Sequence, residues 1–183
     1  MRPKVNMNRH LFSFKAFVAL LGITGSLQGC SSLPEVRTQA YAQLKSEKTF
    51  ETDFESTWKA IESALRLNTI TSRNPSEVTP LEFSQLPQRT LQTDWVFSRS
   101  RTKYIDYQVD GFPRKTYLQT RFKYQILAER LLGGIKVRVM TQEEIERLDA
   151  RGNPVGYTQI GEPDSSLASD LIEKISQELR SAP

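Results

Sequence analysis

Histidine and cysteine are nearly absent from this chain, and their scarcity excludes much chemistry. The 183 residues contain one histidine, His10, and one cysteine, Cys30. A product that begins at Cys30 has no histidine and no second cysteine, which excludes Ser-His-Asp and Cys-His mechanisms, histidine-ligated metals and cysteine-rich zinc sites. No disulfide can form within the chain. We therefore expect neither a metal nor another cofactor.

Acidic residues are missing from the first 29 positions, and this changes the meaning of the net charge. The chain has 25 lysines and arginines against 21 aspartates and glutamates, a formal charge of +4. The whole excess lies in Arg2, Lys4, Arg9 and Lys15. Subtracting these four from 25 leaves 21 bases and 21 acids from Cys30 onward. A neutral remainder does not indicate a nucleic-acid partner.

Long apolar runs are absent apart from residues 16–27, AFVALLGITGSL. This run is too short to span a bilayer, which takes roughly 20 residues. With its basic flank and the following Leu27-Gln28-Gly29-Cys30, it resembles the lipobox signal of bacterial lipoproteins. A plain secretory signal cut elsewhere, or a retained membrane anchor, are the alternatives.

The lipobox resemblance implies cleavage before Cys30 and acylation of this residue with long chains such as palmitate. Ser31, rather than Asp, follows the cysteine, which by resemblance to enterobacterial sorting implies the inner leaflet of the outer membrane. The predicted organisation is a signal peptide at 1–29, a lipidated Cys30 with a tether at 30–47, and one domain at 48–183. An extended tether would reach roughly 55 Å, although a short amphipathic turn around Tyr41 and Leu44 is an alternative.

Helical periodicity appears at two places in the domain. Phe54, Trp58, Ile61 and Leu65 share one face of a helix expected from Asp53 to about Asn68. A second helix should begin near residues 163–166 and end at Arg180.

Strand periodicity fills much of the rest. Residues 117–128 and 135–141 alternate apolar and polar side chains around a turn at 131–134, which predicts a long antiparallel hairpin. Other strands are expected at 48–52, from Ile70, at 90–98 and at 155–160, with a short edge strand possible at 81–85. Residues 99–115 fit an extra hairpin or a mobile loop, and 143–150 fit strand or helix. The fold class is therefore α+β, an antiparallel sheet with an N-terminal and a C-terminal helix on one face.

Acid–base catalysis would have to depend on carboxylates, lysine or tyrosine, because histidine is missing from Cys30 onward. Two carboxylates about 5–9 Å apart hydrolyse glycosides. The candidates fall in loops or on exposed strands, where a solvated surface is the expected role, so we expect no enzyme. These candidates are Asp106, Asp110, Glu143, Glu144 and Glu146.

Basic and aromatic residues offer a better candidate site. Arg121 and Lys123 share the polar face of one hairpin strand, and Lys136 and Arg138 that of the next, so the four are expected to form one basic patch, or else an ordinary solvated face. Aromatic residues gather with further bases in 99–117, a composition typical of protein interfaces. The candidate partner-binding residues are Arg99, Arg101, Tyr104, Tyr107, Arg121, Lys123, Lys136 and Arg138.

The order of these features resembles the helix-grip domain of NlpB/BamC-type outer-membrane lipoproteins. The resemblance is carried by Cys30, Phe54 and Trp58, Thr93-Asp94-Trp95, residues 121–124, residues 135–137 and the C-terminal helix. It implies a non-catalytic, periplasm-facing module that binds an envelope protein in outer-membrane protein assembly or envelope maintenance. The family has two such domains and a long N-terminal segment, whereas this chain has one domain and a short segment.

Two other functions remain open from the sequence. The first is a binder of lipid or another small apolar ligand between sheet and helices, for which a cavity lined by Trp58, Trp95, Phe122 and Ile126 is expected. The second is a carbohydrate-acting enzyme, which needs two carboxylates in one cleft.

Overall fold

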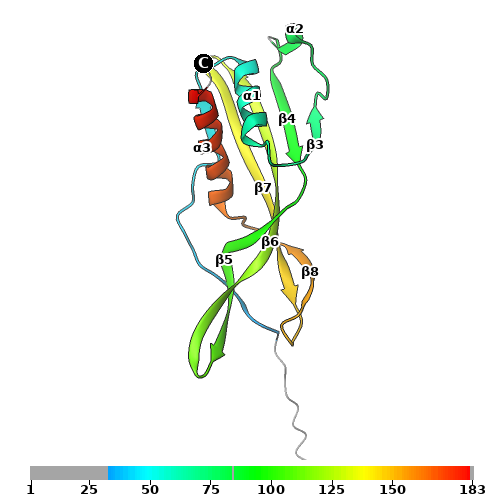
Figure 1. Cartoon of the computed structure of the whole chain (residues 1–183). Helices are drawn as coiled ribbons and strands as arrows, with labels where there is room; N and C mark the ends of the chain where they lie inside the picture. The colour runs from blue at the N-terminus through cyan, green and yellow to red at the C-terminus, as the bar shows by residue number, and fades with distance from the viewer. Residues whose placement is uncertain (1–32, 84, 182–183) are drawn as a thin grey trace, which may run out of the picture. The chain divides into compact units, whose positions relative to one another are not determined.

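Two long antiparallel strands form the centre of the fold. A computed structural model describes residues 33–181 except Ser84, and the predicted α+β class is confirmed: a curled antiparallel sheet carries α1 and α3 on one face (Figure 1). The elements in chain order are β1 (Val36–Thr38), β2 (Glu47–Phe50), α1 (Phe54–Ala64), β3 (Ile70–Asn74), α2 (Pro80–Phe83), β4 (Gln88–Thr93), β5 (Val96–Val109), β6 (Phe112–Leu131), β7 (Gly134–Leu148), β8 (Pro154–Gln159) and α3 (Ser165–Ser181).

Strands β6 and β7 pair with each other, and the outer edge of each pairs with two shorter strands. Along β6, the N-terminal half pairs with β5 and the C-terminal half with β4. Along β7, the first residues pair with β2 and the last with β8. Strand β3 extends the sheet beyond β4, and β1 extends it beyond β5. The predicted hairpin of 117–128 with 135–141 is thus the middle of a longer pair.

The core lies between this pair and the two helices. The alternation in the sequence is confirmed: Phe122 and Ile126 of β6 are buried on the helix side, with Val137 and Val139 beside them on β7. Each apolar side chain of this size stabilises the fold by roughly 1.5–3 kcal/mol on burial. The helices contribute Phe54, Trp58 and Ile61 from α1 and Leu171 and Ile175 from α3.

Helix α1 begins where the sequence predicts and ends earlier. The Asp53 carboxylate accepts hydrogen bonds from the Ser56 amide at 2.9 Å and from its hydroxyl at 2.6 Å, which caps the helix. These bonds lower the pKa of Asp53. The helix ends at Ala64, with Leu65 as its C-cap. Helix α3 runs to Ser181, one residue beyond the predicted Arg180.

The possible edge strand at 81–85 is wrong, because helix α2 occupies Pro80–Phe83. Thr79 and Glu82 form a capping box: the Glu82 carboxylate accepts from the Thr79 amide and hydroxyl, both at 2.8 Å. Proline follows Thr79 at the first helical position, which favours the same start. This signal is legible in the sequence Thr-Pro-Leu-Glu.

The single strand expected at 90–98 is two strands. β4 ends at Thr93 and β5 begins at Val96, while the Asp94 carboxylate accepts a hydrogen bond from the Trp95 amide at 2.8 Å. This break moves the chain from one half of the β6 edge to the other. Residues 99–115 form a hairpin instead of a mobile loop, with Asp110 and Gly111 at φ 52° and 79° in its two-residue turn.

Residues 36–47, which fall within the predicted tether, lie along the domain. Val36–Thr38 form β1 and pair with Lys103–Ile105 of β5, and Arg37 contacts Asp106 at 3.0 Å. Farther along, the Leu44 amide donates to the Ser165 hydroxyl at 3.2 Å. A segment of three residues is too short for its periodicity to predict a strand. β1 forms because the outer edge of β5 is available for backbone pairing.

The signal peptide at 1–29 and the lipidation site Cys30 lie outside the described residues. Between Cys30 and β1 there remain six residue steps, at most about 20 Å instead of 55 Å. In the described part of the chain, no helix is long and apolar enough to cross a membrane.

Substitution of two glycines with positive φ, Gly111 and Gly134, distinguishes the cost of backbone strain from the cost of a steric clash. A Cβ at Gly134 would overlap the Phe50 carbonyl oxygen of β2, whereas a Cβ at Gly111 would meet nothing within 4 Å. We expect Gly111→Ala to cost about 1–2 kcal/mol for its positive φ alone, and Gly134→Ala to cost clearly more. Urea unfolding of both variants tests this. Equal losses in the free energy of unfolding would show that β2 moves to accommodate the added Cβ without cost.

Candidate partner-binding surface

The face of the sheet opposite α1 and α3 carries an aromatic and basic cluster. Its position follows from the strand register, in which Phe97 on β5 opposes Arg121 on β6, and Arg121 opposes Glu144 on β7. Since successive side chains alternate between the faces and Phe122 points to the core, Arg121 lies on the opposite side. We call the following set the open-face cluster: Trp95, Phe97, Arg121, Lys123 and Tyr157.

Arg121 is the centre of the open-face cluster. Its guanidinium carbon lies 4.7 Å from the ring centroid of Trp95 and 4.6 Å from that of Tyr157. Its Nε and Nη2 donate to the Glu144 carboxylate at 2.8 and 2.7 Å. The Lys123 ammonium lies 5.0 Å from the centroid of Trp95. The guanidinium is therefore held by rings and by a carboxylate.

Phe97 gives this cluster an exposed apolar group. Its side chain is 66% exposed and its ring meets that of Tyr157 edge-on, with centroids 6.1 Å apart. Trp, Tyr and Arg supply most of the binding energy in protein interfaces, and they do so best when their rotamers are held before binding. The cluster offers such held groups around one exposed aromatic ring, on a sheet face that neither α1 nor α3 covers.

Of the two interpretations of these four bases, one basic patch or an ordinary solvated face, the register favours the second, because it separates the two pairs of residues. Lys136 and Arg138 contact the Glu47 carboxylate at 2.8 and 2.9 Å. Arg138 opposes Leu127 on β6, four residues from Lys123, or about 13 Å along the strand. Hydrogen bonds from Lys136 and Arg138 lower the pKa of Glu47. Lys136 and Arg138 thus share one carboxylate and lie apart from the open-face cluster.

The remaining candidate residues lie at other places. Arg99 is exposed on β5, opposite Gln119. Arg101 is turned toward α3 and contacts Ser166 and Asp170, both at 3.1 Å.

Tyr104 and Tyr107 belong to the projecting β5–β6 hairpin. The Tyr104 ring lies 5.8 Å from that of Tyr117 and 4.3 Å from the Lys115 ammonium, and Tyr107 is 44% exposed. The eight predicted residues therefore do not form one surface.

Sequence reasoning missed Tyr157 entirely and considered Glu144 only as a catalytic acid. Both join Arg121 through pairing between strands, which no local pattern reports. The strand expected at 155–160, which carries Tyr157, is confirmed as β8.

The acidic segment 143–150 is a strand, and its first carboxylate is buried instead of solvated. Glu143 is 1% exposed on the helix side of β7. One oxygen accepts from the Thr120 hydroxyl at 2.9 Å and the other from the Asp164 amide at 2.8 Å. Glu143 thereby joins β7 to the residue that precedes α3, a structural role for both of its oxygens.

A cavity of about 160 Å³ lies beside Glu143, between β5, β6, β7 and α3. Tyr124, Asp170 and Lys174 also line this cavity. Burial, aided by nearby Asp170, raises the pKa of Tyr124 to about 12, so its hydroxyl stays protonated near neutral pH. Two of the other carboxylate candidates are engaged elsewhere, since Asp106 contacts Arg37 and Glu144 contacts Arg121. In residues 33–181, Ser84 aside, no three His, Cys, Asp or Glu side chains are grouped to hold a metal ion.

The four residues expected around an apolar ligand do not share a cavity. Trp95 lies on the open face, whereas Trp58, Phe122 and Ile126 are in the core. Ile126 is 0% exposed, so no space large enough for water touches it. The cavity that the ligand-binding alternative requires among these four residues is therefore not found.

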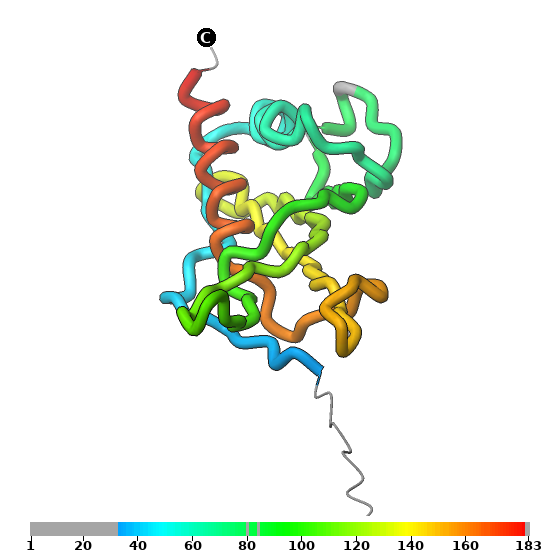
Figure 2. Tube along the Cα trace, turned by 60° about the horizontal axis from the view of Figure 1, so that its bottom comes forward, coloured from blue at the N-terminus to red at the C-terminus, as the bar shows by residue number. Residues whose placement is uncertain are grey.

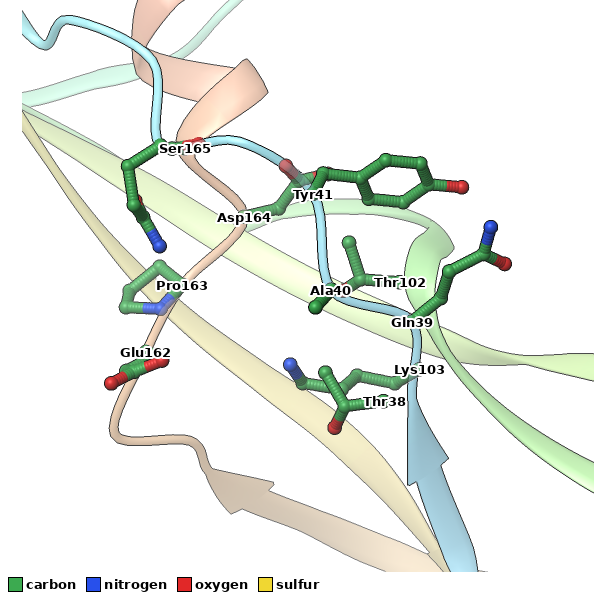
Figure 3. A pocket seen from close by; sticks show the side chains of 11 residues that line it. Thr38, Gln39, Ala40, Tyr41, Thr102, Lys103, Glu162, Pro163, Asp164 and Ser165 are labelled. Atoms are coloured by element: carbon green, nitrogen blue, oxygen red, sulfur yellow. The ribbon is translucent and has the colours of Figure 1, made fainter.

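A smaller crevice of about 110 Å³ lies where residues 38–43 cross β5 and the loop before α3. In Figure 3, Thr38, Lys103 and Glu162 surround it, while the Tyr41 ring points away. Its formation depends on the N-terminal segment lying on the domain.

No protein-family model matches this sequence, and a search among curated proteins finds no match. The assignment of a function therefore depends on the geometry of the chain's own residues.

Replacing Arg121 should change the surroundings of Trp95. We expect Arg121→Ser to lower the free energy of unfolding by about 1–2 kcal/mol, because two cation–π contacts and one partly buried ion pair are lost. Tryptophan emission should shift to the red through Trp95, since Trp58 stays buried. Fluorescence and urea unfolding measure both effects. Arg99→Ser is the matched control, and equal behaviour of the two variants would contradict the assigned contacts.

Tyr124 should make stability fall at high pH. Its folded-state pKa, about 12, exceeds the ordinary value of 10.0. Its contribution is therefore fully present below pH 10 and is lost as pH rises to 12, a change of about 2–3 kcal/mol. Unfolding at pH 9 and pH 12 should show this extra loss in the native protein and not in Tyr124→Phe. Parallel profiles would argue against the burial of this hydroxyl.

Proposed function

We propose that this chain is a non-enzymatic lipoprotein of the NlpB/BamC type, anchored in the outer membrane and facing the periplasm. Its single helix-grip-like domain binds an envelope protein that acts in outer-membrane protein assembly or envelope maintenance. The observation that carries this proposal is the open-face cluster, in which Arg121 is held between Trp95 and Tyr157 beside exposed Phe97.

The chemistry of the chain supports a binding role over catalysis. From Cys30 onward there is no histidine and no second cysteine. Glu143, the most buried of the candidate acids, has both oxygens occupied by structural hydrogen bonds. A preorganised aromatic and basic surface on a sheet is better suited to protein contact than to acid–base chemistry.

The neutral charge of the remainder supports a protein partner over a polyanion. Nucleic-acid binding depends on unneutralised lysines and arginines. Here Arg121, Lys136 and Arg138 each have a carboxylate partner. Aromatic stacking and shape, more than net charge, are therefore what this surface offers.

Lipidation of Cys30 is tested by the mass of the protein itself. Purified from membranes, the protein should begin at Cys30 and carry the mass of three acyl chains. Cys30→Ser should retain the signal peptide and lack the acyl mass. A mature protein that begins elsewhere without lipid would refute the anchor.

The partner surface is tested by site-specific crosslinking in cells. We expect a photocrosslinking amino acid at Phe97 to capture a defined envelope protein, identified by mass spectrometry, with barrel-assembly components as the expected class. The same amino acid at Leu67, 92% exposed after α1, is the matched control. Arg121→Ser combined with Phe97→Ser should reduce capture in a membrane pull-down at least tenfold, with the fold confirmed by circular dichroism. Unchanged capture would remove the open-face cluster as the binding surface.

A further inference from the structure

One end of the sheet collects the β5–β6 turn, β8 and the beginning of the described chain. Figures 1 and 2 both show the blue beginning of the described chain at the same end as this turn and β8, away from α2 and the C-terminal end of α3. The pairing of Val36 with Ile105 and of Leu148 with Pro154 agrees with this arrangement. We call this region, residues 33–38, 103–117 and 147–156, the hairpin end.

Cys30, which lies outside the described residues, is joined to the hairpin end by a short piece of chain. Leu33 is three residue steps from Cys30, at most about 10 Å. The chain then enters the sheet at Val36 and is held there by β5. Acyl chains on Cys30 would consequently keep the hairpin end close to the bilayer, because no long tether separates them.

Apolar side chains are exposed at the turn of this hairpin. Phe112 is 66% exposed, Val109 46% and Tyr107 44%, although all three lie on a well-paired hairpin. Arg114 opposes Tyr107, and Lys115 is the next residue after Arg114 in β6. Aromatic rings with adjacent bases are suited to the boundary between lipid headgroups and acyl chains, where the rings have one apolar and one wet side.

A second apolar feature lies farther from the turn, between residues of β1, β5, β7 and β8. A cavity of about 310 Å³ is lined by Leu33, Val36, Ile105, Ile145, Leu148 and Val155, among others. Leu33 and Val155 are themselves 68% and 52% exposed. Leu33, the first described residue after Cys30, therefore lies on an apolar cavity.

We propose that the hairpin end docks on the surface of the bilayer that holds the acyl chains of Cys30, an inference that rests on the proposed lipid anchor. Val109 and Phe112 enter the headgroup boundary, and Arg114 and Lys115 meet lipid phosphates. Phe97 of the open-face cluster opposes Arg121, nine residues along β6 from Phe112, so the strand can hold it up to about 30 Å from the membrane. In this docked orientation, the partner surface faces the periplasm.

The test uses the acylated full-length protein with one new cysteine. Because the sulfur of Cys30 is blocked by lipid, Phe112→Cys supplies the one thiol that an NBD maleimide labels. Leu132→Cys, in the fully exposed turn at the other end of β6, is the matched control. Both proteins are reconstituted in vesicles of phosphatidylethanolamine and phosphatidylglycerol that contain a doxyl-labelled lipid.

We expect the label at 112 to be quenched at least threefold more than the label at 132, with emission shifted to the blue. Equal quenching at the two positions would overturn the docking proposal. A label at Tyr107→Cys should show the same quenching and lose it when Val109 and Phe112 are both changed to Ser. Persistent quenching in that variant would overturn the role of the apolar turn.

The intact mass separates this inference from the proposed function. A protein without acyl chains on Cys30 would refute the anchor, and with it the docking. An acylated protein whose hairpin label stays in water would refute the docking alone. Capture of a protein at position 112 by a photocrosslinker, without lipid quenching, would identify this end as a protein interface and overturn the membrane assignment.

Discussion

The pairing of β6 with β7 is the constraint on which the rest of this structure depends. The two strands are 20 and 15 residues long, and they pair from Leu131–Gly134 to Thr120–Ile145. Each is long enough to give its outer edge to two shorter strands, so β2, β4, β5 and β8 take their positions from it. The helices in turn pack on the apolar side chains that this pair aligns.

One strand pair therefore builds two surfaces with different roles. On one face, Phe122, Ile126 and Val137 form a dry core with α1 and α3. On the other face, the same alternation presents Arg121 and Lys123 beside Trp95. A shift of one residue in the register would exchange the two sets, so the core and the candidate partner surface are specified together. This coupling makes the open face as well defined as the core that lies behind it.

The sequence predicted the elements whose signal is local. Two such signals each depend on one segment only, and both are confirmed. One is the set of four apolar residues in α1 and its C-cap, at steps of four, three and four. The other is the alternation of residues 117–128. A local signal was also overlooked at Thr79 and Glu82, whose capping box begins α2. A single strand was predicted over 90–98, although Asp94 was also considered as a strand-end or turn residue. The strand is broken there because β4 and β5 pair with different halves of one edge of β6.

The expected basic patch shows the limit of this reasoning. Placing Arg121, Lys123, Lys136 and Arg138 on one face was right, since the period of a strand is two. Placing them together required the register, and the register puts about 13 Å between Lys123 and Arg138. Glu143 shows the same limit, because its neighbours Thr120 and Asp164 come from β6 and from the residue before α3.

What the sequence determined by itself is therefore composition and periodicity: a neutral, histidine-free remainder after Cys30, a half-buried hairpin and two amphipathic helices. The tertiary structure decided which distant side chains meet. It brought Trp95, Glu144 and Tyr157 to Arg121, buried Glu143, and paired residues 36–38 with β5. The physical reason is that side-chain alternation is a property of each segment, whereas register and edge pairing are free-energy minima of segments far apart in the chain.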